Sequence, residues 1–230
     1  MSSALNARLF SVAELVRQGA VLADIGTDHA YLPIFLLERG RITHAILSDI
    51  NRGPLASARE NAEEHGLIDR VTLVLSDGAA SLSESGATDY AICGMGGELI
   101  ASIIDAAPHL CSPDINLLLQ PMTRQAHLRR YLYSHGFRII REVYSTEGDK
   151  HYVVMQVRYV GERVELDDCE AELGIEECEF INTESRISYL YVRYAAARRA
   201  RVGRFGNCNV PESAMHLEET IAEKIEQLKS

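Results

Sequence analysis

The sequence predicts an α/β fold, with a mostly parallel sheet of seven strands followed by a small helical domain. Up to about residue 160, apolar β-branched runs alternate with segments of helical periodicity. The last two of these runs follow each other without a helix between them, which is typical of an antiparallel hairpin. Beyond residue 160, apolar residues recur only at three- and four-residue steps. We therefore expect a sheet-bearing domain over 1–160 and a helical hairpin domain over 161–230.

The first five predicted strands are short and continuously apolar, as parallel strands buried on both faces are. They lie near 20–25, 44–50, 71–75, 88–93 and 115–119. The antiparallel pair is expected near 137–144 and 151–159. Helical periodicity is clearest over Pro54–His65, Leu99–Ala107 and Gln125–Ser134.

Two amphipathic patterns predict antiparallel helices that pack like a coiled coil at the end of the chain. The first pattern consists of Phe180, Ile187, Leu190, Tyr194 and Ala197, and the second of Leu217, Ile221, Ile225 and Leu228. Gly203, Gly206 and Asn207 interrupt the chain between them, and Pro211 suits the first turn of a helix.

The net charge of −10 argues against unspecific binding to a polyanion. The charge is segregated, however. Between Glu162 and Glu184 ten acidic residues stand against one base, whereas Ser185–Val210 holds six arginines and no acid. A local basic face on an acidic molecule can still meet phosphates.

The composition predicts a cytoplasmic protein. The five cysteines are odd in number and never form a CxxC pair, which indicates reduced thiols rather than disulfides or a zinc site. No apolar run approaches the length of a membrane span, and the first residues lack the profile of a signal peptide. We expect no membrane partner and no metal.

The turn after the first strand, Asp24-Ile25-Gly26, is the strongest candidate for a ligand site. It lacks the glycines of the dinucleotide fingerprint and the Gly-Lys pair of a P-loop. An acid, one residue and a glycine are typical of sites for S-adenosylmethionine, which has no phosphate. Asp24 can face its ammonium while turn N–H groups face its carboxylate. Alternatively, Asp24 caps the next helix and Gly26 only permits a turn.

Two further acids follow the next two strands. Asp49 comes 23 positions after Gly26, where a carboxylate hydrogen-bonds a ribose diol in related sheets. Asp77 precedes Gly78 after the third strand and can accept from the adenine amino group. The alternatives are an acid that starts the next helix and a common Asp-Gly turn. Three acids at successive strand ends line one edge of the sheet, where open α/β folds bind ligands.

The fourth and fifth strands end in segments that suit a planar substrate. Gly94-Met95-Gly96-Gly97 offers bare backbone against which a planar substrate or the cofactor can lie, or else it only provides flexibility before the next helix. Gln120 can offer an amide to a base edge, or else belongs to a turn that leads into a helix.

Together these segments resemble the bacterial tRNA adenine-N1 methyltransferases that act on adenine 22 in the D-arm region. The matching pieces are Ala23–Pro33, Gly94–Gly97, Leu119-Gln120-Pro121 and Glu147…Lys150…Tyr152. The resemblance covers essentially the whole chain, and Asp-Ile-Gly-Thr-Asp-His-Ala-Tyr-Leu-Pro is far more specific than a generic glycine turn. The family commonly has Asn where this chain has Met122, which leaves the role of Met122 open. It usually has Glu where this chain has Asp49, a conservative change for a diol ligand.

The resemblance implies a Rossmann-like class I methyltransferase sheet with a coiled-coil-like C-terminal domain, S-adenosylmethionine as cofactor and tRNA as partner. The oligomeric state stays open, with a monomer favoured. The candidate catalytic residues are Asp28 and Tyr31, with a helix cap and packing as their respective alternatives. The candidate cofactor-binding residues are Asp24, Gly26, Asp28, His29, Asp49, Ile50, Asp77, Gly78 and Gly94.

Phosphate contacts are expected from arginines. The candidate tRNA-binding residues are Arg8, Arg124, Arg129, Arg193, Arg198, Arg201 and Arg204, the last four on one side of a helix. The alternative is a solvated face balanced by the acidic stretch before it. Rival functions are a methyltransferase of the same fold acting on another RNA position or a small molecule, and a non-catalytic cofactor-binding protein that recruits a partner.

Overall fold

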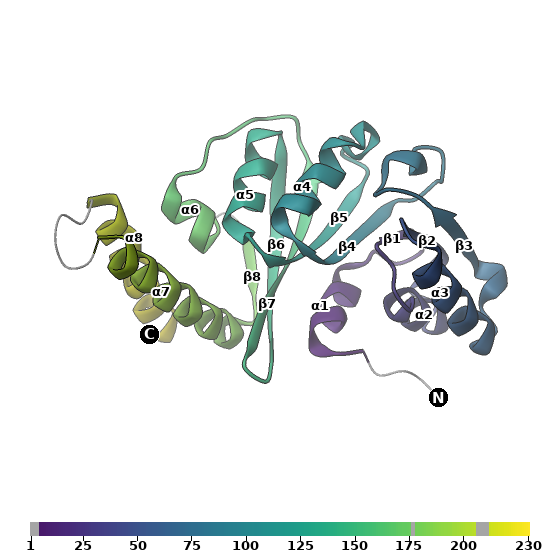
Figure 1. Cartoon of the computed structure of the whole chain (residues 1–230), viewed down its shortest axis with the longest axis horizontal. Helices are drawn as coiled ribbons and strands as arrows, with labels where there is room; N and C mark the ends of the chain where they lie inside the picture. The colour runs from purple at the N-terminus through teal and green to yellow at the C-terminus, as the bar shows by residue number, and fades with distance from the viewer. Residues whose placement is uncertain (1–4, 176–177, 206–211) are drawn as a thin grey trace.

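A computed structural model of the chain describes residues 5–175, 178–205 and 212–230, with the backbone alone at 203–205 and 212–214. The described residues form one mixed sheet in the order β3-β2-β1-β4-β5-β7-β6-β8 (Figure 1). The strands are β1 (Ala20–Ile25), β2 (Ile42–Asp49), β3 (Val71–Leu75), β4 (Asp89–Gly96), β5 (Asn116–Thr123), β6 (Phe137–Glu147), β7 (Lys150–Tyr159) and β8 (Glu179–Ile181).

The strand directions confirm the predicted α/β topology. β1 to β5 are parallel to one another, and β7 runs antiparallel between β5 and β6. β6 and β7 form the expected hairpin, in which Glu147 faces Lys150 across a two-residue turn. Because β1 to β5 are parallel, their carboxyl ends lie at one edge of the sheet.

Helices cover both faces of the sheet (Figure 1). Residues of α1, α2 and α3 share one buried apolar cluster with the sheet, whereas α4 and α5 pack into the cluster on the other face. These five helices are α1 (Ala7–Leu15), α2 (Tyr31–Glu38), α3 (Arg52–Glu64), α4 (Gly97–Asp105) and α5 (Gln125–Ser134). The helix α5 has the predicted bounds, whereas α1 was not predicted.

The expectation of seven strands is wrong, because β8 adds an eighth. It pairs in parallel with β6 at the end of the sheet, with Glu142 opposite Phe180. A strand of three residues is too short to show the alternation of apolar and polar residues by which a strand is recognised in a sequence. A short helix, α6 (Asp168–Leu173), precedes β8 and begins with a capping box in which Asp167 and Glu170 bond each other's backbone N–H.

The C-terminal segments form the predicted pair of antiparallel helices, α7 (Thr183–Phe205) and α8 (Glu212–Lys229). Their direction follows from two contacts, since Arg201 pairs with Glu218 while Lys229 lies over the ring of Tyr191. Their apolar residues pack against the cluster that also holds α4 and α5. The division at residue 160 stays a prediction, and β8 returns the chain to the sheet beyond it.

Within the described ranges, no helix is both long and apolar enough to cross a bilayer.

Candidate functional site

The three strand-end acids stand at one edge of the sheet, as the sequence predicts. The N–H groups of Gly26 and Thr27 donate to the carbonyl of Ser48, at 2.8 and 3.0 Å. In the same way, the Ser76 N–H donates to the carbonyl of Asp49 at 3.0 Å. These bonds tie the ends of β1, β2 and β3 together, so Asp24, Asp49 and Asp77 lie on three neighbouring strand ends.

Asp24 lies on the face of the sheet that α1 covers. It pairs with Leu47 of β2 and Ala91 of β4, both of which belong to the apolar cluster that includes α1. Burial raises the pKa of the Asp24 carboxyl from 3.8 to about 6, against the opposing effects of the Thr27 hydroxyl and the Arg8 guanidinium. Asp24 is therefore mostly ionised at neutral pH and can face an ammonium group.

Arg8 reaches the same place from α1. Its Nη1 donates to Oε1 of Gln120 at 2.7 Å, and that oxygen also accepts from the Gly94 N–H at 3.1 Å. Gln120 is fully buried, and its amide nitrogen donates to the carbonyl of Pro121 and the sulfur of Met122. The expectation that Gln120 offers its amide to a base edge is wrong, because this amide is turned inward and engaged.

Two glycines at this edge are required, Gly26 by its backbone conformation and Gly97 by the close approach of another backbone segment. Gly26 has φ +74°, which side chains rarely adopt, and the Met95 methyl lies over the turn, 2.1 Å from where a Cβ would be. A Cβ on Gly97 would lie 2.4 Å from the carbonyl oxygen of Arg124. The start of α4 thus packs against the backbone that leads into α5, which excludes simple flexibility as the reason for Gly97.

The turn before α2 presents an exposed cluster of Asp28, His29 and Tyr31. The N-cap of α2 is Ala30, with φ 54° and no side-chain cap, so neither Asp24 nor Asp28 caps this helix. The Asp28 side chain is 78% exposed and lies 3.6 Å from Nε2 of His29. The His29 ring stacks on Tyr31 with centroids 5.2 Å apart. Asn61 of α3 fixes the turn by donating to the His29 carbonyl at 2.6 Å.

Asp49 stabilises a turn with one carboxylate oxygen and leaves the other oxygen without a partner among the described residues. Its Oδ1 accepts from the Asn51 N–H at 2.7 Å, just before α3. Its second oxygen has no hydrogen-bond partner among the described residues. Ile50 is 59% exposed beside it, and Gly78, with φ +65°, turns the chain after the exposed Asp77.

These groups fit the polar parts of S-adenosylmethionine. An ionised Asp24 suits the ammonium, the free oxygen of Asp49 suits a ribose diol, and Ile50 offers an apolar surface to adenine. The Thr27 hydroxyl is buried beside the Asp24 carboxylate, whose pKa it lowers, so these two polar groups lie together at the end of β1.

Arg129 does not belong to a tRNA-binding face, contrary to expectation. It is fully buried, and its guanidinium bonds the Glu142 carboxylate at 2.8 and 3.2 Å and the carbonyl of Ala171 at 2.8 Å. Burial alone would lower the pKa of this guanidinium, but the Glu142 carboxylate holds it above its ordinary value. Arg129 therefore joins α5 to β6 and to the end of α6. Sequence alone did not distinguish this arginine from an exposed one.

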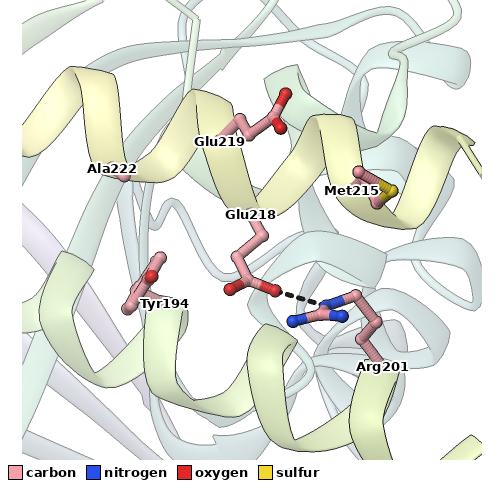
Figure 2. Close-up of a pocket in the computed structure, with 6 residues that line it drawn as sticks. All are labelled: Tyr194, Arg201, Met215, Glu218, Glu219 and Ala222. Atoms are coloured by element: carbon pink, nitrogen blue, oxygen red, sulfur yellow. Dashed lines mark hydrogen bonds and ion pairs between the residues drawn. The ribbon is translucent and has the colours of Figure 1, made fainter. Parts of the chain in front are cut away.

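Most of the expected arginines on α7 are paired within the protein. Arg201 turns toward α8 and pairs with Glu218 at 2.6 Å, in a hollow that Tyr194, Met215, Glu219 and Ala222 also line (Figure 2). Arg193 pairs with Glu172 and is 28% exposed. Arg198 is 63% exposed and 3.9 Å from Glu218. The side chain of Arg204 lies outside the described residues.

Arg124 is the expected tRNA contact nearest the strand ends. Its side chain is 69% exposed and lies 3.4 Å from the Glu98 carboxylate. Arg8, by contrast, is half-buried and lies against Gln120. Its contact with tRNA stays a prediction, and α1, which carries Arg8 to the strand ends, has no clear signal in the sequence.

In the described part of the chain, no three His, Cys, Asp or Glu side chains gather as a group that could hold a metal ion.

Comparisons with known proteins agree with this geometry. Residues 5–155 match a family described as "Methyltransferase domain". The chain is 38% identical to the tRNA (adenine(22)-N(1))-methyltransferase of Bacillus subtilis over 159 residues, which cover 69% of this chain and 66% of that protein. The aligned segment thus spans just under two thirds of that relative.

Two solved structures match nearly the full length. The Streptococcus pneumoniae protein Sp1610 in complex with S-adenosyl-L-methionine has a TM-score of 0.80 and 30% identity, covering 96% of this chain and 100% of that one. The B. subtilis m1A22 tRNA methyltransferase TrmK has a TM-score of 0.73 and 28% identity, covering 98% of this chain and 97% of that one.

Proposed function

Because this chain belongs to the family of bacterial tRNA (adenine-22-N1)-methyltransferases, we propose that it transfers the methyl group of S-adenosylmethionine to N1 of adenine 22 in tRNA. The observation that carries this proposal is the set of acids on three adjacent strand ends, with Asp24 ionised beside the buried Thr27 hydroxyl. From this substrate we infer a cytoplasmic location.

The sparse chemistry of the site suits this reaction. Adenine N1 carries a lone pair at neutral pH, so it attacks the methyl carbon without a strong base, and the bond from that carbon to sulfur breaks. The protein has to align the two partners and exclude water, which is catalysis by positioning. The positive charge moves from sulfur to the adenine ring, where a nearby carboxylate stabilises it.

The exposed cluster before α2 supplies groups for the base. Asp28 faces solvent beside the turn that holds the cofactor, so its carboxylate can stabilise the methylated ring or accept from the adenine amino group. Tyr31, 45% exposed and stacked on His29, offers a ring face to an adenine taken out of its stack.

Contacts to tRNA phosphates fall on the arginines that remain exposed. Arg198 and Arg199 of α7 line an open hollow of about 510 Å³ together with Tyr194, Ala195 and Val202. Arg124 stands exposed where β5 leads into α5. Arg193 and Arg201 contribute less, because their charges are already paired with Glu172 and Glu218.

The test is methyl transfer to an unmodified tRNA transcript, followed by mapping of the modified nucleoside. We expect one 1-methyladenosine at position 22, and none in a transcript with guanine at that position. Methylation at another position would support the first rival function. Cofactor binding without any transfer to RNA would support a small-molecule methyltransferase or a non-catalytic protein, and either result would reject the proposal.

A second experiment tests the tRNA surface. Arg198→Gln/Arg199→Gln should weaken tRNA binding and reduce the slope of log affinity against log salt by about one to two, because phosphate contacts release counterions. Arg59→Gln/Arg163→Gln removes the same charge from exposed residues elsewhere and should leave the tRNA affinity and the salt slope unchanged. Equal losses of tRNA and cofactor affinity in the first variant would indicate misfolding rather than a binding surface.

A further inference from the structure

A pocket of about 400 Å³ lies between α1, the end of β6 and the start of α7, and the proposed reaction does not use it. Three elements line it, α1 at Ala7 and Glu14, β6 at Val143–Thr146, and the start of α7 at Asn182 and Ser185. Figure 1 shows the end of the β6–β7 hairpin between α1 and α7. This α1–α7 pocket has a volume within the range of about 300–1,000 Å³ that small-ligand sites occupy.

The α1–α7 pocket lies toward the same edge of the sheet as the strand-end acids. β6 is parallel to β5, because both are antiparallel to β7, so Val143–Thr146 approach the carboxyl edge. In the sheet, β6 is the fourth strand from β1, which at about 4.8 Å per strand places the pocket about 19 Å from the end of β1. An adenine held beside β1 for methylation cannot reach so far. The pocket therefore suits a second part of the same substrate.

Two polar groups of the α1–α7 pocket lack a partner within the described ranges. The Ser145 side chain is buried, and its hydroxyl oxygen makes no hydrogen bond. The exposed Glu14 carboxylate makes neither an ion pair nor a hydrogen bond there. A buried polar group without a partner costs free energy, which a ligand that bonds it recovers. The pocket therefore favours a ligand with hydrogen-bonding groups.

The charges around the pocket favour an uncharged ligand that donates hydrogen bonds. Glu14 lines the pocket, and Glu184 stands in the first turn of α7. Both carboxylates repel a phosphate. A carboxylate is an acceptor only, so its partner has to carry N–H or O–H groups. Among nucleobases, adenine, cytosine and guanine carry an amino group with such donors, whereas uracil carries none.

Phe10 adds an aromatic surface to the same pocket. Its ring is 47% exposed although it lies in the middle of α1. An edge-to-face contact with Phe35 of α2, with ring centroids 6.2 Å apart, holds it in place. An exposed aromatic ring is the surface on which proteins stack unpaired bases of RNA, whose edges are then bonded by polar groups.

We propose that the α1–α7 pocket binds a second unpaired base of the tRNA, one that carries an amino group. This base stacks on Phe10, donates to the Glu14 carboxylate and bonds the Ser145 hydroxyl. Anchoring it fixes where the rest of the tRNA lies over the strand ends, so the pocket helps to select the adenine that is methylated. The inference rests on the proposed function, from which it takes tRNA as the substrate.

The first test measures the affinity of the protein for a synthetic tRNA and for copies in which one unpaired base, outside position 22, is replaced by an abasic site. We expect one of these copies to bind the wild-type protein about fivefold or more weakly. Phe10→Ala should weaken binding of the complete tRNA by a similar factor and should not respond to that abasic site, because the contact is already lost. Ile140→Ala, which removes an exposed apolar side chain of β6, should behave as wild type.

Glu14→Gln distinguishes a bound base from a nearby phosphate. If the carboxylate accepts from an amino group, this variant should bind the complete tRNA more weakly. If the pocket faces only phosphates, the loss of a negative charge should instead strengthen binding. Glu64→Gln removes the same charge from an exposed residue of α3 and should leave the affinity unchanged.

The proposal would be overturned by a wild-type protein indifferent to every abasic site, by a Phe10→Ala variant that responds to them as wild type does, or by tighter binding of Glu14→Gln. Affinity for S-adenosylhomocysteine should stay at the wild-type value in each variant. Should Phe10→Ala lose it, Ser145→Ala provides the same test, because removing a buried hydroxyl without a partner does not destabilise the fold. A wild-type protein that methylates no tRNA would instead reject the proposed function.

Discussion

Lowering the pH from 7 to 5 should weaken cofactor binding through protonation of Asp24. The pKa of this carboxyl is about 6 in the free protein, and only the ionised form attracts the ligand's ammonium. At pH 7 about nine tenths of Asp24 is ionised, whereas at pH 5 about one tenth is. The apparent affinity should therefore fall about tenfold over this interval.

The other charged groups that face Asp24 do not titrate in this interval. Burial and the Asp24 charge itself raise the pKa of the Cys93 thiol well above its ordinary range. The Arg8 guanidinium stays charged, and so does the ammonium of the ligand. The Asp24→Asn variant therefore isolates the contribution of this carboxyl to the dependence on pH.

The assay is calorimetric titration with S-adenosylhomocysteine at pH 5, 6 and 7. Asp24→Asn should bind more weakly at pH 7 and lose the tenfold dependence on pH that Asp24 contributes. A wild-type affinity that is constant from pH 5 to 7, or an equal slope in both proteins, would refute the assignment of Asp24 to the ammonium.

Protonation of Asp24, which weakens cofactor binding, should stabilise the folded protein. Its pKa is raised on folding, so the native state binds this proton more tightly than the unfolded chain does. The ionised form costs stability above about pH 6, and that cost disappears as the pH falls below the unfolded value near 4. Asp24→Asn should therefore unfold at higher denaturant concentration than the wild-type protein at pH 7.5, and the difference should shrink by pH 5.

Three further changes test other parts of the structure. Arg129→Met leaves the buried Glu142 carboxylate unpaired and should lower the free energy of unfolding, measured in urea, by about 3–5 kcal/mol. The double variant Arg129→Met/Glu142→Leu should recover much of this loss. Equal losses in both variants would show that the unpaired carboxylate is not the cause of the destabilisation. Gly97→Ala should destabilise the protein by about 1–3 kcal/mol because its Cβ meets backbone 2.4 Å away, while Gly53→Ala, with open space in α3, should not destabilise it. Tyr31→Ala should lower kcat/KM for tRNA with an unchanged Kd for the cofactor, and Tyr31→Phe should restore the rate; failure of that rescue would exclude stacking.

The sheet was predictable because each strand carries its own signal. The runs that became β1 to β5 are continuously apolar, and the hairpin of β6 and β7 lacks room for a helix, so both strand type and direction followed from the sequence. β8 was not predicted because its three residues form a strand only by pairing with β6, and no local sequence pattern indicates this pairing.

The acids of the site were predictable for the same reason, since their place depends only on where a strand ends. The arginines were not. Whether an arginine is exposed depends on which carboxylate folding brings to it, and Glu142 reaches Arg129 from a different element. Likewise, Arg8 joins Gln120 across 112 positions of the chain. Such partners follow from the tertiary fold and leave no mark in the spacing of residues.

The most direct test of the account is a crystal structure of the protein with S-adenosylhomocysteine bound. We expect one ligand to lie across the ends of β1, β2 and β3, with its ammonium at Asp24 and its ribose at Asp49. A ligand bound elsewhere, or bound at this edge with Asp24 and Asp49 turned away from it, would contradict the account.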